Sequence, residues 1–271
     1  SSLTKFQDKF PIRCFDTGIT EQHAVTFAAG LAADGMKPIV HLYSTFAQRA
    51  FDQIVHDVAL QNLPVVFTLD RAGLVGEDGA THHGAFDLSF LNSIPNLQIL
   101  APMDAAELRG MLAYAFGQSA PVVIRFPRGG EENATFEERK IEKASFERIQ
   151  KGEKITVVSL GTIGQEVAKA VKDLTEVGHV NLRFLKPWND AALKEALQQS
   201  STIITAEEGS MRGGLRDAMA AWASEHLPVA RVKGIGLPDQ FVAHATPEEL
   251  AADFGLDAAG IKATIKELTG F

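Results

Sequence analysis

Carboxylates and imidazoles gather in one short glycine-rich stretch, Gly76-Glu-Asp-Gly-Ala-Thr-His-His-Gly-Ala-Phe-Asp87. Neither a helical nor a strand pattern continues through it, so we expect a loop. Its two adjacent histidines do not suit one shared metal ion, and the sequence has no His-Glu-x-x-His or Cys-x-x-Cys motif. The spacing leaves two interpretations open: a loop that holds Asp78 and His82 near a ligand, and a plain polar turn.

Two aromatic residues and an arginine mark a second candidate site. Tyr43, Phe46 and Arg49 follow a β-branched run and open a helical pattern. This places them at the C-terminal end of a strand, where open α/β folds bind ligands. Aromatic rings offer a flat contact face, and a guanidinium group binds anions through paired donors. The alternative is an aromatic core contact beside a solvated arginine.

Glu21 follows Thr20, a candidate N-cap residue, and precedes an alanine-rich helical pattern from Ala24 to Ala33. The helix dipole favours an ionised carboxylate in the first turn, so the pattern by itself favours a structural role for Glu21. The pair Glu207-Glu208 lies at a strand end, where we expect a solvated or interface role.

The elements that must position these residues alternate between strands and helices, which is typical of βαβ units on parallel sheets. We therefore predict an α/β fold with two open, mostly parallel sheets flanked by helices. The predicted strands cover 38–43, 63–69, 97–100, 121–126, 155–160, 180–184, 202–206 and 229–235. The predicted helices cover 24–33, 46–60, 104–115, 164–177, 190–199, 213–222 and a tail after Thr246.

A segment between Pro127 and Lys154, first glycine-rich and then charged, divides the chain. We predict a first domain over residues 1–135, a linker over 136–153 and a second domain over 154–271. The opening residues read as the end of an amphipathic helix that runs into Pro11, so we expect the first domain to be incomplete at its N-terminus.

The bulk composition excludes several classes of protein. The chain has 271 residues, 45% of them hydrophobic, and a net charge of −8 with scattered Lys and Arg, which argues against nucleic-acid binding. One cysteine, Cys14, excludes an intrachain disulfide and fits a reducing compartment. The sequence shows no apolar run long enough for a membrane span and no signal pattern, so we expect a cytoplasmic protein.

Five motifs in order are closely similar to those of the 1-deoxy-D-xylulose-5-phosphate synthase family, and the resemblance covers essentially the whole chain. They are Thr20-Glu-Gln-His23, Tyr43-Ser-Thr-Phe-Ala-Gln-Arg49, Asp70-Arg-Ala-Gly73, Gly76-Glu-Asp-Gly-Ala-Thr-His82 and Phe126-Pro-Arg-Gly129. The family is of the transketolase type and depends on thiamine diphosphate. The resemblance implies a pyrimidine-binding domain and a transketolase C-terminal domain. It also implies that a diphosphate-binding domain, without a counterpart here, holds the diphosphate and Mg²⁺.

The resemblance also implies roles for the cofactor-facing residues. Glu21 corresponds to the glutamate that hydrogen-bonds the pyrimidine N1′ and promotes deprotonation of the reactive cofactor carbon. Sharing a proton with N1′ needs a dry environment, so Glu21 should be buried and face a pocket. Phe46 corresponds to the aromatic residue that stacks on the pyrimidine, and Tyr43 to a neighbour in the same site.

Four further residues correspond to the substrate side of the site. Arg49 and Arg128 are implied to hold the phosphate of glyceraldehyde 3-phosphate. Asp78 and His82 match the loop pair near the reacting carbon, and we expect His82 to hydrogen-bond the acceptor and transfer a proton. Relatives often have glutamine where this chain has His83; its role stays open, and we expect it to be exposed. No residue is predicted to bind a metal.

The implied reaction condenses pyruvate with glyceraldehyde 3-phosphate, with loss of CO₂, to give 1-deoxy-D-xylulose 5-phosphate, a precursor of isoprenoids, thiamine and pyridoxal phosphate. The implied partners are the missing domain and a second copy in a homodimer; the chain alone should be inactive. Two alternatives stay open. One is the β subunit of a 2-oxoacid dehydrogenase decarboxylase component, which would lack the arginine pair. The other is a non-catalytic binding module.

Overall fold

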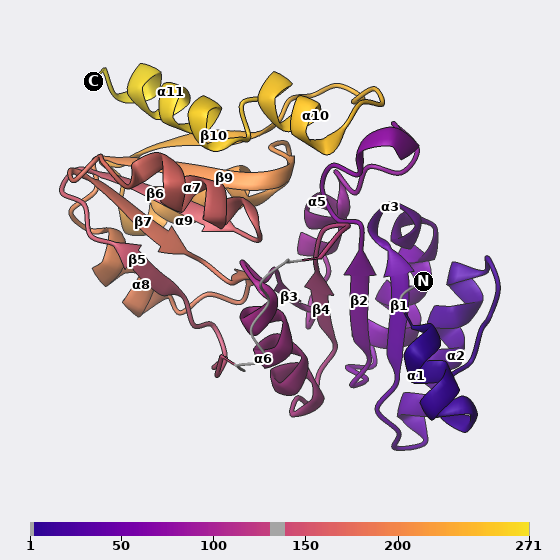
Figure 1. Cartoon of the computed structure of the whole chain (residues 1–271). Helices are drawn as coiled ribbons and strands as arrows, with labels where there is room; N and C mark the ends of the chain where they lie inside the picture. Colours follow the sequence, from indigo (N-terminus) through magenta and orange to yellow (C-terminus); the bar gives the residue numbers. More distant parts are fainter. Residues whose placement is uncertain (1–2, 131–138, 271) are drawn as a thin grey trace.

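The computed structural model describes residues 3–130 and 139–270, which form two five-stranded sheets flanked by helices (Figure 1). In the first sheet the strand order is β1, β2, β4, β3, β8, and the first four strands run parallel. The bounds are β1 Ile39–Tyr43, β2 Val66–Asp70, β4 Val122–Arg125, β3 Gln98–Leu100 and β8 Phe184–Lys186.

The second sheet has the order β10, β9, β6, β7, β5, and here only the edge strand β5 runs antiparallel to its neighbour. The prediction of two open, mostly parallel sheets is confirmed. The bounds are β10 Arg231–Leu237, β9 Thr202–Ser210, β6 Ile155–Leu160, β7 Val177–Asn181 and β5 Glu147–Gln150.

Two strands depart from the sequence prediction. Strand β5 lies within the predicted linker 136–153, of which residues 136–138 fall outside the described residues. Its sequence has a single apolar residue, Ile149, because an edge strand needs no buried run on both faces. The predicted strand 180–184 is divided between β7 and β8, and β8 joins the first sheet by pairing with β3.

In the first half, helix α2 (Glu21–Ala33) packs on β1, as Figure 1 shows. The helix predicted over 46–60 is interrupted and ends in the π-helical segment η3. Helix α5, six residues long, was not predicted because its apolar pattern is too short to show a period. The other elements are α1 Thr4–Lys9, η1 Pro11–Arg13, α3 Ser44–Ala47, η2 Gln48–Ala50, α4 Phe51–Gln53, η3 Ile54–Ala59, η4 Gly76–Asp78, α5 Asp87–Asn92 and α6 Ala105–Phe116.

In the second half, the helix predicted to end at Val177 ends at Val171. Val177 instead begins β7, because a short apolar run has no period that separates helix from strand. The helices are α7 Ile163–Val171, α8 Asp190–Leu197, α9 Leu215–His226, α10 Pro247–Asp253 and α11 Ala258–Thr269.

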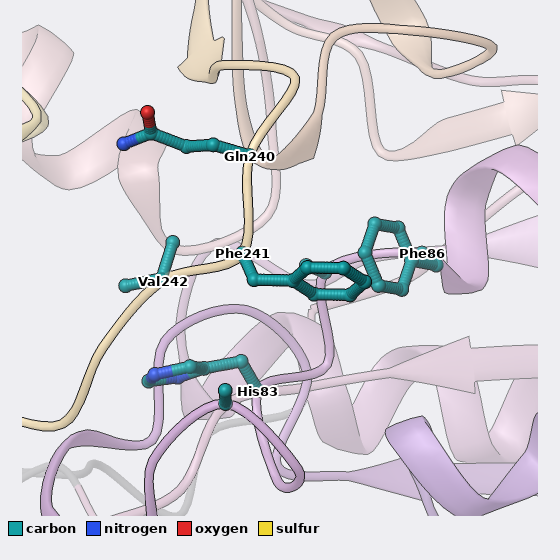
Figure 2. Close-up of a pocket in the computed structure, with 7 residues that line it drawn as sticks. His83, Phe86, Gln240, Phe241 and Val242 are labelled. Carbon is teal, nitrogen blue, oxygen red and sulfur yellow. The ribbon is translucent and has the colours of Figure 1, made fainter.

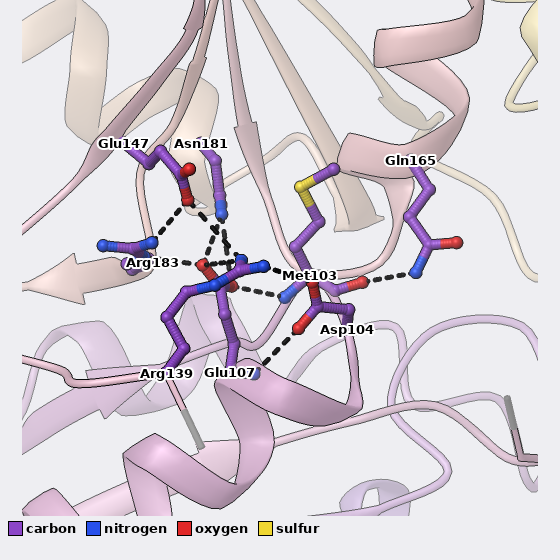
Figure 3. A network of polar contacts seen from close by, with 8 residues as sticks. All are labelled: Met103, Asp104, Glu107, Arg139, Glu147, Gln165, Asn181 and Arg183. Atoms are coloured by element: carbon purple, nitrogen blue, oxygen red, sulfur yellow. Dashed lines mark hydrogen bonds and ion pairs between the residues drawn. The ribbon is translucent and has the colours of Figure 1, made fainter. Parts of the chain in front are cut away.

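The two halves pack against each other through apolar and charged contacts. One buried cluster includes Val25 and Leu91 of the first half and Leu182 and Met219 of the second. Beside it, the carboxylate of Glu107 on α6 is fully buried and accepts hydrogen bonds from second-half side chains (Figure 3). These donors are Asn181 Nδ2 at 2.9 Å and Arg183 Nε at 2.6 Å, with Arg139 Nη1 at 3.3 Å from the connecting segment. The second half therefore packs against helices of the first half.

Candidate active site

The start of α2 places Glu21 next to Arg49. Glu21 is 8% exposed, so its expected burial is confirmed, and its Oε2 accepts from Arg49 Nη1 at 3.4 Å. Thr20 does occupy the N-cap position. In the described part of the chain, however, its side chain accepts no hydrogen bond from α2 and instead donates to the Thr17 carbonyl. Thr20 is therefore the N-cap residue, as predicted, but its hydroxyl does not bond the N–H groups of the first turn.

Aromatic contacts continue from Arg49 toward the glycine-rich loop. The guanidinium carbon of Arg49 lies 5.3 Å from the centroid of Phe46, a cation–π contact. Phe46 is stacked with Tyr43 at 5.9 Å and meets the edge of His82 at 5.3 Å. Glu21, Arg49, Phe46 and His82 thus form one continuous run of contacts, from the start of α2 to the loop.

The loop brings in the second predicted arginine. Arg128 Nη1 lies 3.0 Å from Asp78 Oδ2 and 3.4 Å from the Val75 carbonyl oxygen. Both side chains of the Arg128–Asp78 pair are partly exposed, at 48% and 39%, so a ligand can still reach them. Arg49 therefore contacts Glu21 at the start of α2, whereas Arg128 contacts the glycine-rich loop.

Three residues of this site carried no predicted role. Asp70 pairs in register with Tyr43 at the carboxyl edge of the sheet. Its carboxylate accepts from the Arg71 backbone N–H at 2.7 Å and from Arg71 Nη1 at 3.2 Å. The Arg71 guanidinium carbon lies 3.8 Å from the centroid of Tyr43, and His41 Nε2 lies 3.9 Å from Asp70. Burial lowers the pKa of His41.

A sequence signal for these residues existed. Asp70 and Arg71 follow the strand next to the one that ends at Tyr43, and parallel neighbours end at the same edge of a sheet. Arg71 also has φ +59°, a conformation uncommon for a residue other than glycine, which the sequence does not reveal.

His83 is buried, at 4% exposure, so the expectation that it faces solvent is wrong. Its Nδ1 accepts from the Val75 backbone N–H at 3.1 Å, and its Nε2 lies 3.1 Å from the Ala243 carbonyl oxygen. A small pocket lies beside it, on the side of the loop that faces the second half (Figure 2). The pocket is lined by Ala80, His83, Ala85, Phe86, Gln240, Phe241 and Val242. It is separate from the run of contacts that starts at Glu21.

We expected a solvated or interface role for Glu207 and Glu208, and the solvated role is wrong for Glu207, which is buried. Glu208 is partly buried, and its carbonyl oxygen accepts from Arg125 of the first half at 3.0 Å. The Glu207 side chain is fully buried and accepts from the backbone N–H groups of Leu215 and Arg216 at 2.8 and 2.9 Å, at the start of α9. Burial raises the pKa of Glu207 to about 7, against the lowering effect of these two bonds. Glu208 accepts from the Thr162 hydroxyl at 2.7 Å. The side-chain contacts of both glutamates thus lie within the second half.

Within residues 3–130 and 139–270, no group of three or more His, Cys, Asp or Glu side chains is arranged to hold a metal ion. In the same described part of the chain, no helix is both long and apolar enough to cross a membrane.

Comparison with known proteins defines the class of this fold and site. Residues 1–130 match the transketolase pyrimidine-binding domain, and residues 144–261 match the transketolase C-terminal domain. A solved structure of a split-gene transketolase, described as an inactive beta4 tetramer, has a TM-score of 0.86 and 31% identity. The match covers 98% of this chain and 88% of that one. The chain therefore belongs to the transketolase family.

Within that family, the chain is homologous to part of the 1-deoxy-D-xylulose-5-phosphate synthases. It is 45% identical over 270 residues to 1-deoxy-D-xylulose-5-phosphate synthase 1 of Geobacter sulfurreducens and 46% identical over 271 residues to the synthase of Klebsiella pneumoniae. These matches cover 97% and 98% of this chain. The chain spans 42% and 43% of the length of those relatives.

Proposed function

We propose that this chain forms the pyrimidine-side part of a 1-deoxy-D-xylulose-5-phosphate synthase active site. The complete enzyme would condense pyruvate with glyceraldehyde 3-phosphate, with loss of CO₂. The observation that carries the proposal is the run of contacts from Glu21 through Arg49 and Phe46 to His82. We further propose that residues 1–135 and 154–271 act as two domains joined by 136–153.

The residues present fit the aminopyrimidine part of thiamine diphosphate. Phe46 offers an aromatic surface, and Glu21 offers a buried carboxylate that can accept or share a proton. When bound, the cofactor supplies the carbanion chemistry of the reaction. Glu21 would bind the pyrimidine nitrogen and hold a proton there, while Phe46 and Tyr43 would orient the ring and exclude water.

The substrate-side residues suit an aldehyde phosphate. The guanidinium groups of Arg49 and Arg128 would bind phosphate oxygens, each leaving its present carboxylate partner or sharing it. His82, on the loop with Asp78, would hydrogen-bond the aldehyde oxygen and deliver a proton to it as the new carbon–carbon bond forms.

We propose that a further domain completes the site, because this chain spans 42% and 43% of the length of two relatives. We propose that a diphosphate-binding domain, on another segment or on a separate chain, holds Mg²⁺ and the diphosphate. The described residues do not fit a metal site of their own. The split-gene transketolase supports an arrangement in separate chains. We expect this chain to be inactive alone and to act as a dimer with its partner.

Two alternatives deserve a test. The β subunit of a 2-oxoacid dehydrogenase decarboxylase component would share the fold, but would not need two arginines for a sugar phosphate. A non-catalytic module is kept as the second alternative because the split-gene relative is described as inactive in its beta4 form.

The deciding experiment combines this chain with a diphosphate-binding domain from a relative, thiamine diphosphate and Mg²⁺. Release of CO₂ from pyruvate and formation of 1-deoxy-D-xylulose 5-phosphate are measured with and without glyceraldehyde 3-phosphate. The proposal expects the sugar phosphate only with both proteins and both substrates. Acyl transfer to lipoamide in its place would favour the dehydrogenase subunit, and product formation that survives Glu21→Ala at nearly full rate would rule out the mechanism.

A further inference from the structure

The second half of the chain contacts the glycine-rich loop at several points. Figure 1 shows α10 next to the loop segment that carries η4. A Cβ atom on Gly76 would lie 2.8 Å from Pro247 Cδ, and Gly76 has φ +81°, so this approach requires glycine. A Cβ atom on Gly79 would lie 3.3 Å from His244 Cβ. The loop is therefore packed directly on residues 244–247 of the second half.

His83 makes the hydrogen-bonded contact in this interface. Because a neutral imidazole has one donor and one acceptor, the bond from the Val75 N–H to Nδ1 requires the proton to be on Nε2. Nε2 then donates to the Ala243 carbonyl at 3.1 Å. Figure 2 shows His83 lying under the segment that carries Phe241 and Val242. Both ring nitrogens of this buried side chain thus hold backbone groups, one in each half of the molecule.

The Val75 peptide links His83 to the substrate-side residues. Its N–H donates to His83, and its carbonyl oxygen accepts from Arg128 Nη1 at 3.4 Å. Arg128 in turn pairs with Asp78, and the base of the loop is closed by two backbone bonds between Gly73 and Gly84, at 2.9 and 2.8 Å. A shift of Val75 would therefore move the oxygen that Arg128 contacts.

We propose that His83 is a positioning residue that fixes the active-site loop to the C-terminal domain. Through Val75 and Ala243 it makes the position of Asp78, His82 and Arg128 depend on the second half of the chain. The catalytic consequence rests on the proposed function, whereas the structural link does not. Glutamine can replace this histidine, because its amide offers the same acceptor and donor pair.

The first test measures amide hydrogen exchange in the 271-residue chain by itself. In His83→Leu we expect exchange at Val75 to become roughly tenfold faster, since the amide loses its acceptor. His83→Gln should stay within about twofold of the wild type, because it restores both bonds. The control is His56→Leu, which removes a histidine that is 62% exposed and bonded to Asp52. Unchanged exchange in His83→Leu, or equal acceleration in His83→Gln, would overturn the proposal.

A second measurement needs no variant and so does not depend on the folding of His83→Leu. The ¹⁵N chemical shifts of the wild-type imidazole should report an unprotonated Nδ1 and a protonated Nε2. A proton on Nδ1 would overturn the proposal, because that nitrogen could not accept from Val75.

The third test uses the reconstituted enzyme. We expect His83→Leu to raise the KM for glyceraldehyde 3-phosphate roughly tenfold and to leave the rate of pyruvate decarboxylation without acceptor within about twofold. His83→Gln should restore the KM. Equal losses in both reactions would contradict a role in positioning the acceptor side. If the wild type itself forms no sugar phosphate, the proposed function fails, and the exchange and ¹⁵N measurements still decide the role of His83.

Discussion

Each half of the molecule buries a glutamate carboxylate against the start of a helix, but the two carboxylates have different hydrogen-bond partners. In the second half, the two oxygens of Glu207 accept the Leu215 and Arg216 backbone N–H groups of α9. In the first half, Glu21 accepts from the side chain of Arg49, which is 46% exposed. A mobile side chain can give up its partner more readily than a helix backbone can. The comparison indicates that the capacity of a buried carboxylate to bind a ligand depends on which groups already bond its oxygens, not on burial alone.

The largest expected effect is on catalysis, from Glu21→Gln. This variant keeps the shape of the side chain but removes the carboxylate that would hold a proton at the pyrimidine. In the reconstituted enzyme we expect pyruvate decarboxylation to fall by roughly 10²–10⁴-fold, the range for loss of an acid–base group. Thermal unfolding of the isolated chain should change little. A rate close to that of the wild type would break the contrast between Glu21 and Glu207.

The next largest effect concerns Glu107, whose carboxylate is fully occupied at the contact between the halves (Figure 3). Glu107→Leu leaves the buried Arg183 without this partner and removes the acceptor of Asn181. We expect the free energy of unfolding to fall by about 3 kcal/mol, as for other broken buried ion pairs. Urea unfolding measures this loss. The matched variant Glu142→Leu removes an exposed partner of Lys140 and should leave stability nearly unchanged, because solvent screens this pair.

A third effect is the pH dependence of stability that Glu207 causes. Burial raises its pKa from 4.5 to about 7, so between these values the folded chain binds a proton that the unfolded chain releases. Stability due to this group therefore falls as the pH rises. Burial lowers the pKa of His179 from 6.5 to about 4, so this histidine acts in the opposite direction over an overlapping range.

Replacing Glu207 should uncover the contribution of His179. Relative to the wild type, Glu207→Gln should gain about 1.4 kcal/mol of stability per pH unit between about pH 5 and about pH 7. Urea unfolding at several pH values measures the difference between the two proteins. If the stability difference between the two proteins stayed constant over this range, the N–H groups of α9 would be keeping Glu207 ionised. Glu207 would then differ from Glu21 only in its hydrogen-bond partners.

The fold was predictable where the signal was local. Strands such as Ile155–Leu160, rich in β-branched residues, were predictable because central parallel strands are buried on both faces. The pairing of β8 with β3 was not predictable, because a non-local antiparallel register leaves no trace in a three-residue segment. The edge strand β5 was not predicted because it buries few side chains and so has no apolar run.

In the candidate site, too, local motifs were predictable from the sequence and non-local contacts were not. The motifs around Glu21 and His82 were recognised together, but their contacts depend on how the loop returns to Phe46. The two adjacent histidines differ because neighbouring side chains of the loop face opposite ways: His83 turns toward the second half and is buried. No spacing rule assigns that direction, because the partner at Ala243 lies 160 positions further along the chain.

The smallest expected effect compares two threonines that begin helices. Thr246 caps α10 with a complete capping box to Glu249, whereas the hydroxyl of Thr20 donates to Thr17. Thr246→Ala should therefore cost about 1 kcal/mol of stability, and Thr20→Ala less than about 0.5 kcal/mol. Thermal unfolding of both variants measures the pair. A larger loss for Thr20→Ala would mean that its hydroxyl does bond the first turn of α2 in solution, and the N–H groups beside Glu21 would then be less available to a ligand.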